Sequence, residues 1–192
     1  MSVLTHRTAW VPSDDHTPRS DAAELAAAWV LEQARAHALQ PVLRDPGKVG
    51  NPGRGHAVLA YLPDYDDVHH SLQAARHGAF AAVESCAHPL IGWAMATGAV
   101  DLTTGQITVD SRSETLKEAI ERIHFFDNNG WTRGFGADSA KRILADLPPP
   151  DRDKDLLLGS LCALGSRGRA LERLGELAQR VWKKISTGAD PG

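Results

Sequence analysis

The stretch HAVLAYL at residues 56–62 is the strongest strand signal in this chain. Asp64 follows it at once and is a good N-cap for a helix predicted from about Tyr65 to His77, which ends before Gly78. The next segment, Ala79 to Val83, is almost continuously apolar, as expected for a strand buried on both faces. A strand, a helix and a second strand in close succession indicate an α/β fold.

The same alternation extends outward from this unit to both sides. We expect further strands at 8–12 and 41–44, helices at 21–38 and 88–97, and a hairpin at 100–109. Asp21 and Glu24 have the spacing of a capping box for the first of these helices. No helix connects the strand at 41–44 to the strand at 56–62, so their relative direction stays open. We therefore predict a small three-layer, Rossmann-like sheet domain over residues 1–110.

The pattern changes after residue 110, where no convincing strand follows. Ser111 and Glu114 form a second potential capping box, which opens a helix to about Phe126. Helical segments are also expected at roughly 138–146, 152–164 and 167–185, after a turn-rich loop, DNNGWTRGFG, at 127–136. Residues 111–192 are thus predicted to form an all-helical second domain.

Composition excludes several classes of protein. The chain has 192 residues, of which 42% are hydrophobic and 23% charged, so wholesale disorder is excluded. A net charge of −3 excludes a polybasic protein, but the charge is unevenly divided. Residues 1–110 contain 7 basic and 12 acidic residues, whereas residues 111–192 contain 14 basic and 12 acidic residues. An anion-binding role is therefore expected in the second half.

No sequence feature indicates a membrane span or a disulfide framework. The longest apolar run, Ala22 to Leu31, contains Glu24 and is about half as long as a bilayer requires. The first ten residues lack a signal-peptide core, and Cys86 and Cys162 have no metal-ligand spacing. We expect a cytoplasmic protein with reduced cysteines and no membrane partner.

Acidic residues follow each predicted parallel strand, at the edge of the sheet where ligands usually bind. These residues are Asp14, Asp15, Asp45, Asp64 and Glu84. Together they could hold Mg²⁺, although an acid after a strand is also an ordinary helix cap. Asp66 and His70 lie four residues apart on one helix face, and Asp64 lies nearby, so these three residues are weak metal-ligand candidates. The alternative is that they belong to an ordinary polar helix face that is exposed to solvent.

The glycine-rich segment at 47–55 carries Lys48 and Arg54 and could turn backbone N–H groups toward phosphate. It lacks the Gly-Lys-Ser/Thr ending of a P-loop, which favours a flexible connector. Cys86 and His88 could act as a nucleophile and its base, but neighbours two residues apart rarely reach the required geometry.

The last predicted helix has two distinct faces. Its apolar stripe consists of Leu171, Leu174, Ala178, Val181, Trp182 and Ile185. Its other side carries Arg169, Arg173, Arg180 and Lys184. A basic ridge of this kind can bind nucleic-acid phosphates, and the preceding helix with its turn at Gly165 has a spacing similar to a helix-turn-helix. Pairing of Glu176 with Arg180 on a solvated face is the alternative.

The loop before the second helix of this half places two aromatic residues beside an arginine. Trp131, Arg133 and Phe135 could stack on bases and contact phosphates. Alternatively, both rings turn inward and fix a connection between helices.

These observations favour a nucleic-acid-associated or regulatory binding protein whose helical part contacts DNA or a protein partner. One alternative is a metal-dependent phosphoester or nucleotide hydrolase that uses Asp64, Glu84 and His70. A second alternative is a non-catalytic scaffold. No motif is specific enough to identify a family or to decide whether the protein is an enzyme.

Overall fold

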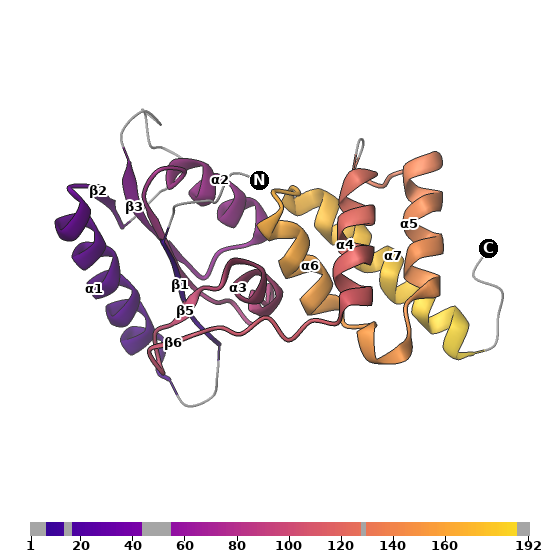
Figure 1. Ribbon diagram of the computed structural model, residues 1–192, viewed down its shortest axis with the longest axis horizontal. Helices are drawn as coiled ribbons and strands as arrows, with labels where there is room; N and C mark the ends of the chain where they lie inside the picture. Colours follow the sequence, from indigo (N-terminus) through magenta and orange to yellow (C-terminus); the bar gives the residue numbers. More distant parts are fainter. Residues whose placement is uncertain (1–6, 14–16, 44–54, 128–129, 188–192) are drawn as a thin grey trace.

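The computed structural model describes residues 7–13, 17–43, 55–127 and 130–187 (Figure 1). The strands are β1 (Arg7–Val11), β2 (Gln40–Val42), β3 (His56–Tyr61), β4 (Ala79–Val83), β5 (Val100–Asp101) and β6 (Gln106–Ile107). The helices are α1 (Arg19–His37), α2 (Tyr65–Ala74), α3 (Ile91–Thr97), α4 (Glu114–Phe125), α5 (Phe135–Asp146), the 3₁₀ helix η2 (Pro149–Asp151), α6 (Lys154–Ala163) and α7 (Gly168–Ser186). Within these ranges, no helix combines the length and the apolar character that crossing a membrane requires.

The strands form one mixed sheet in the order β2-β3-β4-β1-β5-β6. All neighbouring pairs are parallel except β5 and β6, which form the predicted hairpin. The parallel pairing of β2 with β3 answers the question that the sequence left open. The predicted fold class, an α/β sheet with helices on it followed by a helical C-terminal part, is confirmed.

The central strands are buried on both faces, as their composition predicts. Val58, Ala60, Phe80 and Ala82 belong to one core, which also contains residues of α2, α3 and the C-terminal helices. The alternate residues of β3 and β4 belong to a second core against α1. The period of two along each strand therefore separates the two helical layers, which lie on opposite sides of the sheet (Figure 1).

Two helix starts differ from the sequence-based prediction. Helix α1 begins two residues before Asp21, after Pro18, and no side chain caps it. Proline fixes its own φ near the helical value and has no N–H to satisfy, so the helix starts there without the predicted capping box. Ser113, not Ser111, caps α4, because its hydroxyl accepts the N–H of Leu116 at 3.0 Å.

The helical part is joined to the sheet part where α3 crosses α6. Two glycines allow the helices to approach closely. A Cβ on Gly92 would lie 2.2 Å from the Leu156 carbonyl oxygen, and a Cβ on Gly159 would lie 2.8 Å from the backbone nitrogen of Trp93. One core cluster extends across residue 110, from Trp93 of α3 to the apolar face of α7. The position of the helical part relative to the sheet is thus set by backbone-to-backbone contact.

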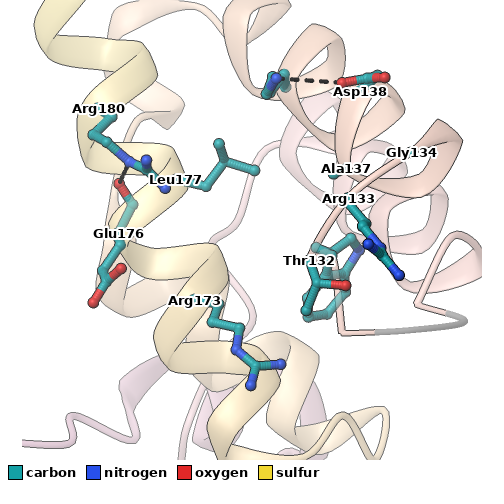
Figure 2. A pocket seen from close by; sticks show the side chains of 11 residues that line it. Thr132, Arg133, Gly134, Ala137, Asp138, Arg173, Glu176, Leu177 and Arg180 are labelled. Carbon is teal, nitrogen blue, oxygen red and sulfur yellow. Dashed lines mark hydrogen bonds and ion pairs between the residues drawn. The ribbon is translucent and has the colours of Figure 1, made fainter.

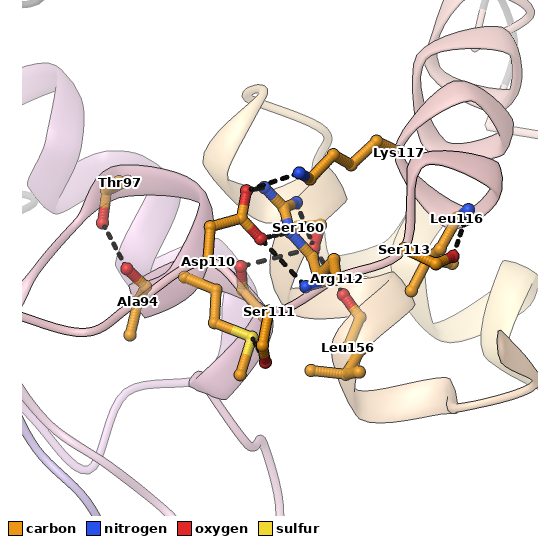
Figure 3. A network of polar contacts seen from close by, with 12 residues as sticks. Ala94, Thr97, Asp110, Ser111, Arg112, Ser113, Leu116, Lys117, Leu156 and Ser160 are labelled. Atoms are coloured by element: carbon orange, nitrogen blue, oxygen red, sulfur yellow. Dashed lines mark hydrogen bonds and ion pairs between the residues drawn. The ribbon is translucent and has the colours of Figure 1, made fainter. Parts of the chain in front are cut away.

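A polar cluster fastens the segment between β6 and α4 to the same crossing (Figure 3). Arg112, whose side chain is 10% exposed, donates to both carboxylate oxygens of Asp110 at 2.8 Å and to the Ser160 hydroxyl at 2.9 Å. Lys117 lies 3.5 Å from the same carboxylate. Hydrogen bonding from Arg112 lowers the pKa of Asp110 to about 2. The carboxylate is therefore ionised at any pH at which the protein is expected to work.

Candidate nucleic-acid interface

A groove of about 520 Å³ separates α7 from the start of α5 and the loop before it (Figure 2). Arg173, Glu176 and Arg180 stand on its α7 side, and Thr132 and Arg133 on the opposite side. Its lining is completed by Trp131, Gly134, Ala137, Asp138, Lys141 and Leu177. The structure therefore brings together four of the six residues that the sequence predicted for nucleic-acid binding.

The groove exists because α7 is strongly amphipathic. Its buried residues lie on one stripe that packs against α5 and α6, as the spacing of Leu171, Leu174, Ala178 and Val181 predicted. At 100° per residue, Arg173 and Arg180 fall on the opposite side, where both are exposed. Packing of the apolar stripe thus turns the basic side chains toward the open side of the α5–α7 contact.

The opposite wall is shaped by a loop with unusual backbone angles. Trp131 has φ 52° and Gly134 has φ 74°, values that favour glycine and turn the chain sharply. The Trp131 indole is only 4% exposed and donates to the Ile123 carbonyl at 3.1 Å, so it anchors the loop to α4. Strain at Trp131 is compensated by burial of its ring, and Arg133 is held at the groove as a result.

The charge of the groove is positive. Arg133, Lys141, Arg173 and Arg180 are opposed by two carboxylates, which leaves a surplus of two positive charges. The Asp138 carboxylate pairs with Lys141 at 3.3 Å. Arg180 Nε donates to a backbone carbonyl of α7, and among the described residues no carboxylate forms an ion pair with Arg173 or Arg180. These two guanidinium groups remain available to an anion.

The remaining predicted residues fall into two groups. Arg169 and Lys184 are exposed on α7 beyond the groove, where they extend its basic side in both directions. Trp131 turns inward, so its ring cannot stack on a base, whereas Phe135 is 70% exposed. The sequence also missed Lys141, because nothing in its neighbourhood shows that this face of α5 meets α7.

The N-terminal end of α7 is covered by α2. The backbone N–H of Gly168, the first residue of α7, donates to Asp66 Oδ1 at 2.7 Å, and a Cβ on Gly168 would lie 2.7 Å from the Asp66 side chain. Asp66 thereby caps α7 from α2, since the N-cap residue Arg167 supplies no side-chain hydrogen bond. A helix-turn-helix inserts the N-terminal residues of its second helix into the major groove. The contact with α2 prevents that docking for α7.

The candidate catalytic and metal-binding residues are each engaged separately. Asp64 caps α2 and forms a capping box with Asp67. Asp66 caps α7, and the His70 ring is exposed beside His69, with 5.8 Å between ring centroids. Across the described ranges, no three His, Cys, Asp or Glu side chains gather as they would around a metal ion. The described part of the chain thus shows no assembled site for Mg²⁺.

Glu84 holds two loops together at the carboxyl edge of the sheet. Its carboxylate accepts the N–H of Ser13 at 2.6 Å and the N–H of Leu90 at 2.5 Å. Burial raises the pKa of Glu84, and the two backbone N–H groups act in the opposite direction. A pocket of about 270 Å³ lies beside it, between the ends of β1 and β4, whose following helices cover opposite faces of the sheet. Ligands of open α/β sheets commonly bind at such a point.

The other sequence candidates near this edge contribute no reactive pair. Cys86 is exposed, while the His88 ring packs edge-on against Tyr65 with 5.4 Å between centroids. Burial raises the pKa of Cys162 to about 12, which keeps this thiol protonated. Asp14, Asp15, Asp45 and most of the glycine-rich segment 47–55 lie outside the described residues.

No family model matches the chain, and neither a curated protein nor a solved structure does.

Proposed function

We propose that this protein binds nucleic acid through the groove between α5 and α7. One observation carries the proposal: four cationic side chains from α5, α7 and the loop before α5 line a single groove, and two of their guanidinium groups, those of Arg173 and Arg180, have no carboxylate partner among the described residues. Phosphate groups are strong hydrogen-bond acceptors for arginine, and their neutralisation supplies much of the affinity for nucleic acid. We also propose, from the sequence alone, that the protein works in the cytoplasm.

The hydrolase alternative has less support from the geometry. Glu84 uses both carboxylate oxygens to hold backbone N–H groups, and Asp64 uses its carboxylate to cap α2. A carboxylate that is engaged in this way has little capacity left for a metal ion or a substrate proton. A binding role accounts for the exposed guanidinium groups of Arg173 and Arg180, which have no carboxylate partner among the described residues, without requiring any reaction.

The test is a salt titration of binding, followed by fluorescence anisotropy. Labelled DNA of mixed sequence, single-stranded and duplex, is titrated with the protein between about 50 and 200 mM salt. The affinity should fall steeply with salt. Arg173→Gln combined with Arg180→Gln should reduce the slope of log K against log salt by about 1.4 to 2, because each lost phosphate contact removes about 0.7 to 1.

Arg35→Gln combined with Arg76→Gln is the matched control. Both arginines are exposed on the sheet part, so this variant has the same net charge as the groove variant. It should bind with an affinity within about twofold of the unmodified protein, since nonspecific charge effects are small and screened. Equal losses in the two variants, or binding that is insensitive to salt, would show that the groove is not the binding site.

A further inference from the structure

Two phenylalanines at the connection from α4 to α5 have largely exposed side chains. Phe125, the last residue of α4, is 76% exposed, and Phe135, the first residue of α5, is 70% exposed. Both contact Phe126, with centroid separations of 5.2 Å and 5.4 Å and ring planes at 79° and 80°. We call Phe125, Phe126 and Phe135 the aromatic cluster.

The cluster is anchored on one side and open on the other. Phe126 is half-buried and packs against the main core, which fixes the position of the ring between the two exposed ones. The edge-to-face contacts use the edges and one face of the rings, so faces of Phe125 and Phe135 remain open to solvent. Flat, rigid and partly anchored rings can bind a planar group at little entropic cost.

The aromatic cluster adjoins the basic groove along the chain. Arg133 and Gly134 line the groove, and Phe135 follows them directly in the chain. The C-terminal end of α4 and the N-terminal end of α5 lie side by side in Figure 1, and the contact of Phe126 with Phe135 joins these two ends. A ligand that spans both must carry negatively charged groups together with flat apolar groups.

We propose that the groove and the aromatic cluster together bind single-stranded nucleic acid, with phosphates on Arg173 and Arg180 and unpaired bases stacked on Phe125 and Phe135. This inference rests on the proposed function. A positively charged groove beside stacking platforms is how proteins bind single strands without reading sequence. In a duplex the base faces are stacked on one another, so exposed rings beside the groove gain nothing from it.

The covered N-terminal end of α7 supports the same choice of ligand. The contact of Gly168 with Asp66 removes the docking mode by which a second helix reads a major groove, whereas a flexible single strand needs only the side of the helix. An apolar protein partner could also cover the aromatic cluster, but the surplus positive charge beside it favours a polyanion.

The experiment compares four probes of equal length: single-stranded DNA, single-stranded RNA, duplex DNA and an abasic deoxyribose-phosphate strand. The abasic strand keeps the phosphates and lacks the bases. Phe125→Ala and Phe135→Ala should each weaken binding to the two base-containing single strands about tenfold, because loss of one stacking contact is worth roughly 5- to 150-fold. Affinity for the abasic and duplex probes should change by less than about twofold.

Val109→Ala is the control, because Val109 is 77% exposed and lies in a segment that is remote from the groove in sequence. This variant should leave all four affinities unchanged. All three side chains are exposed, so the variants should fold, which circular dichroism verifies. Equal binding of abasic and base-containing strands would overturn this inference and leave the proposed function intact. Phenylalanine variants that bind every oligonucleotide normally would also overturn it, and would indicate an apolar protein partner for the cluster. Failure of all probes to bind would overturn both proposals.

Discussion

Insertion of one methyl group at the α3–α6 crossing should destabilise the whole fold. In Gly92→Ala the new Cβ would lie 2.2 Å from the Leu156 carbonyl oxygen, whereas an unstrained carbon–oxygen contact is about 1 Å longer. The atom that blocks it belongs to the backbone of a helix, so no side chain can rotate away. The two helices must separate, which loosens the packing of Trp93 and Leu157, both of them fully buried. Overpacking of this kind costs about 3 kcal/mol.

The assay is thermal unfolding followed by circular dichroism. For a chain of this length, about 3 kcal/mol corresponds to a decrease in Tm of roughly 6 to 12 °C. Gly175→Ala is the matched control, because its Cβ would meet the Leu158 Cδ1 methyl at 3.0 Å, which is the end of a flexible side chain. The higher helix propensity of alanine, worth up to about 1 kcal/mol, should keep this variant within about 1 kcal/mol of the unmodified protein. A Gly92→Ala protein as stable as Gly175→Ala would refute the account of the crossing.

Two further predictions concern polar contacts that hold the helical part in place. Asp66→Ala should lower the free energy of unfolding by about 1 kcal/mol in urea titrations, because it removes the cap on Gly168, and Asp66→Asn should recover most of the loss. The contribution of Asp110 should be present above pH 4 and be lost as the pH falls toward 2, because its pKa is lowered from 3.8 to about 2 in the folded protein. Its size is about 1 kcal/mol after allowance for solvent screening, and Asp110→Asn should flatten the stability profile measured between pH 2.5 and 6. An unchanged profile would mean that the bond to Arg112 contributes nothing to stability.

The elements that the sequence predicts best are those whose residues face one kind of environment. The strand at 79–83 is predicted residue by residue, because it is buried on both faces and flanked by Gly78 and Glu84. The direction of β2 relative to β3 could not be predicted, since strand direction depends on a connection that has no helical pattern. The predicted start of α1 at Asp21 is wrong because the helix begins directly after Pro18, whose fixed φ favours a helix start there without a side-chain cap.

The candidate site was predictable only where a single helix determines it. Arg173 and Arg180 share a face by helical periodicity, so the sequence could pair them. Lys141 lies on another helix, and its approach to them depends on how α5 packs against α7. Trp131 and Phe135 looked equivalent in the loop, yet one is buried and the other exposed. Trp131 is the buried one because its indole N–H donates to the Ile123 carbonyl, and this contact cannot be predicted from the local sequence.

Helix α7 has two roles that different residues perform, and this separation makes the function testable. Its apolar stripe and its first residue, Gly168, fix the helix against α5, α6 and α2, whereas its exposed arginines contact no other element through an ion pair in the described residues. Substitutions in the apolar stripe or at Gly168 should weaken binding only by lowering the fraction of folded protein. A tightly bound nucleic-acid strand should therefore raise the Tm of these variants again by mass action. Substitutions of the exposed arginines should leave the Tm of the ligand-free protein unchanged and should reduce the increase in Tm that the ligand causes. If a substitution of Arg173 or Arg180 lowered the Tm of the ligand-free protein, that arginine would stabilise the fold, and the groove would be a result of helix packing and not a binding site.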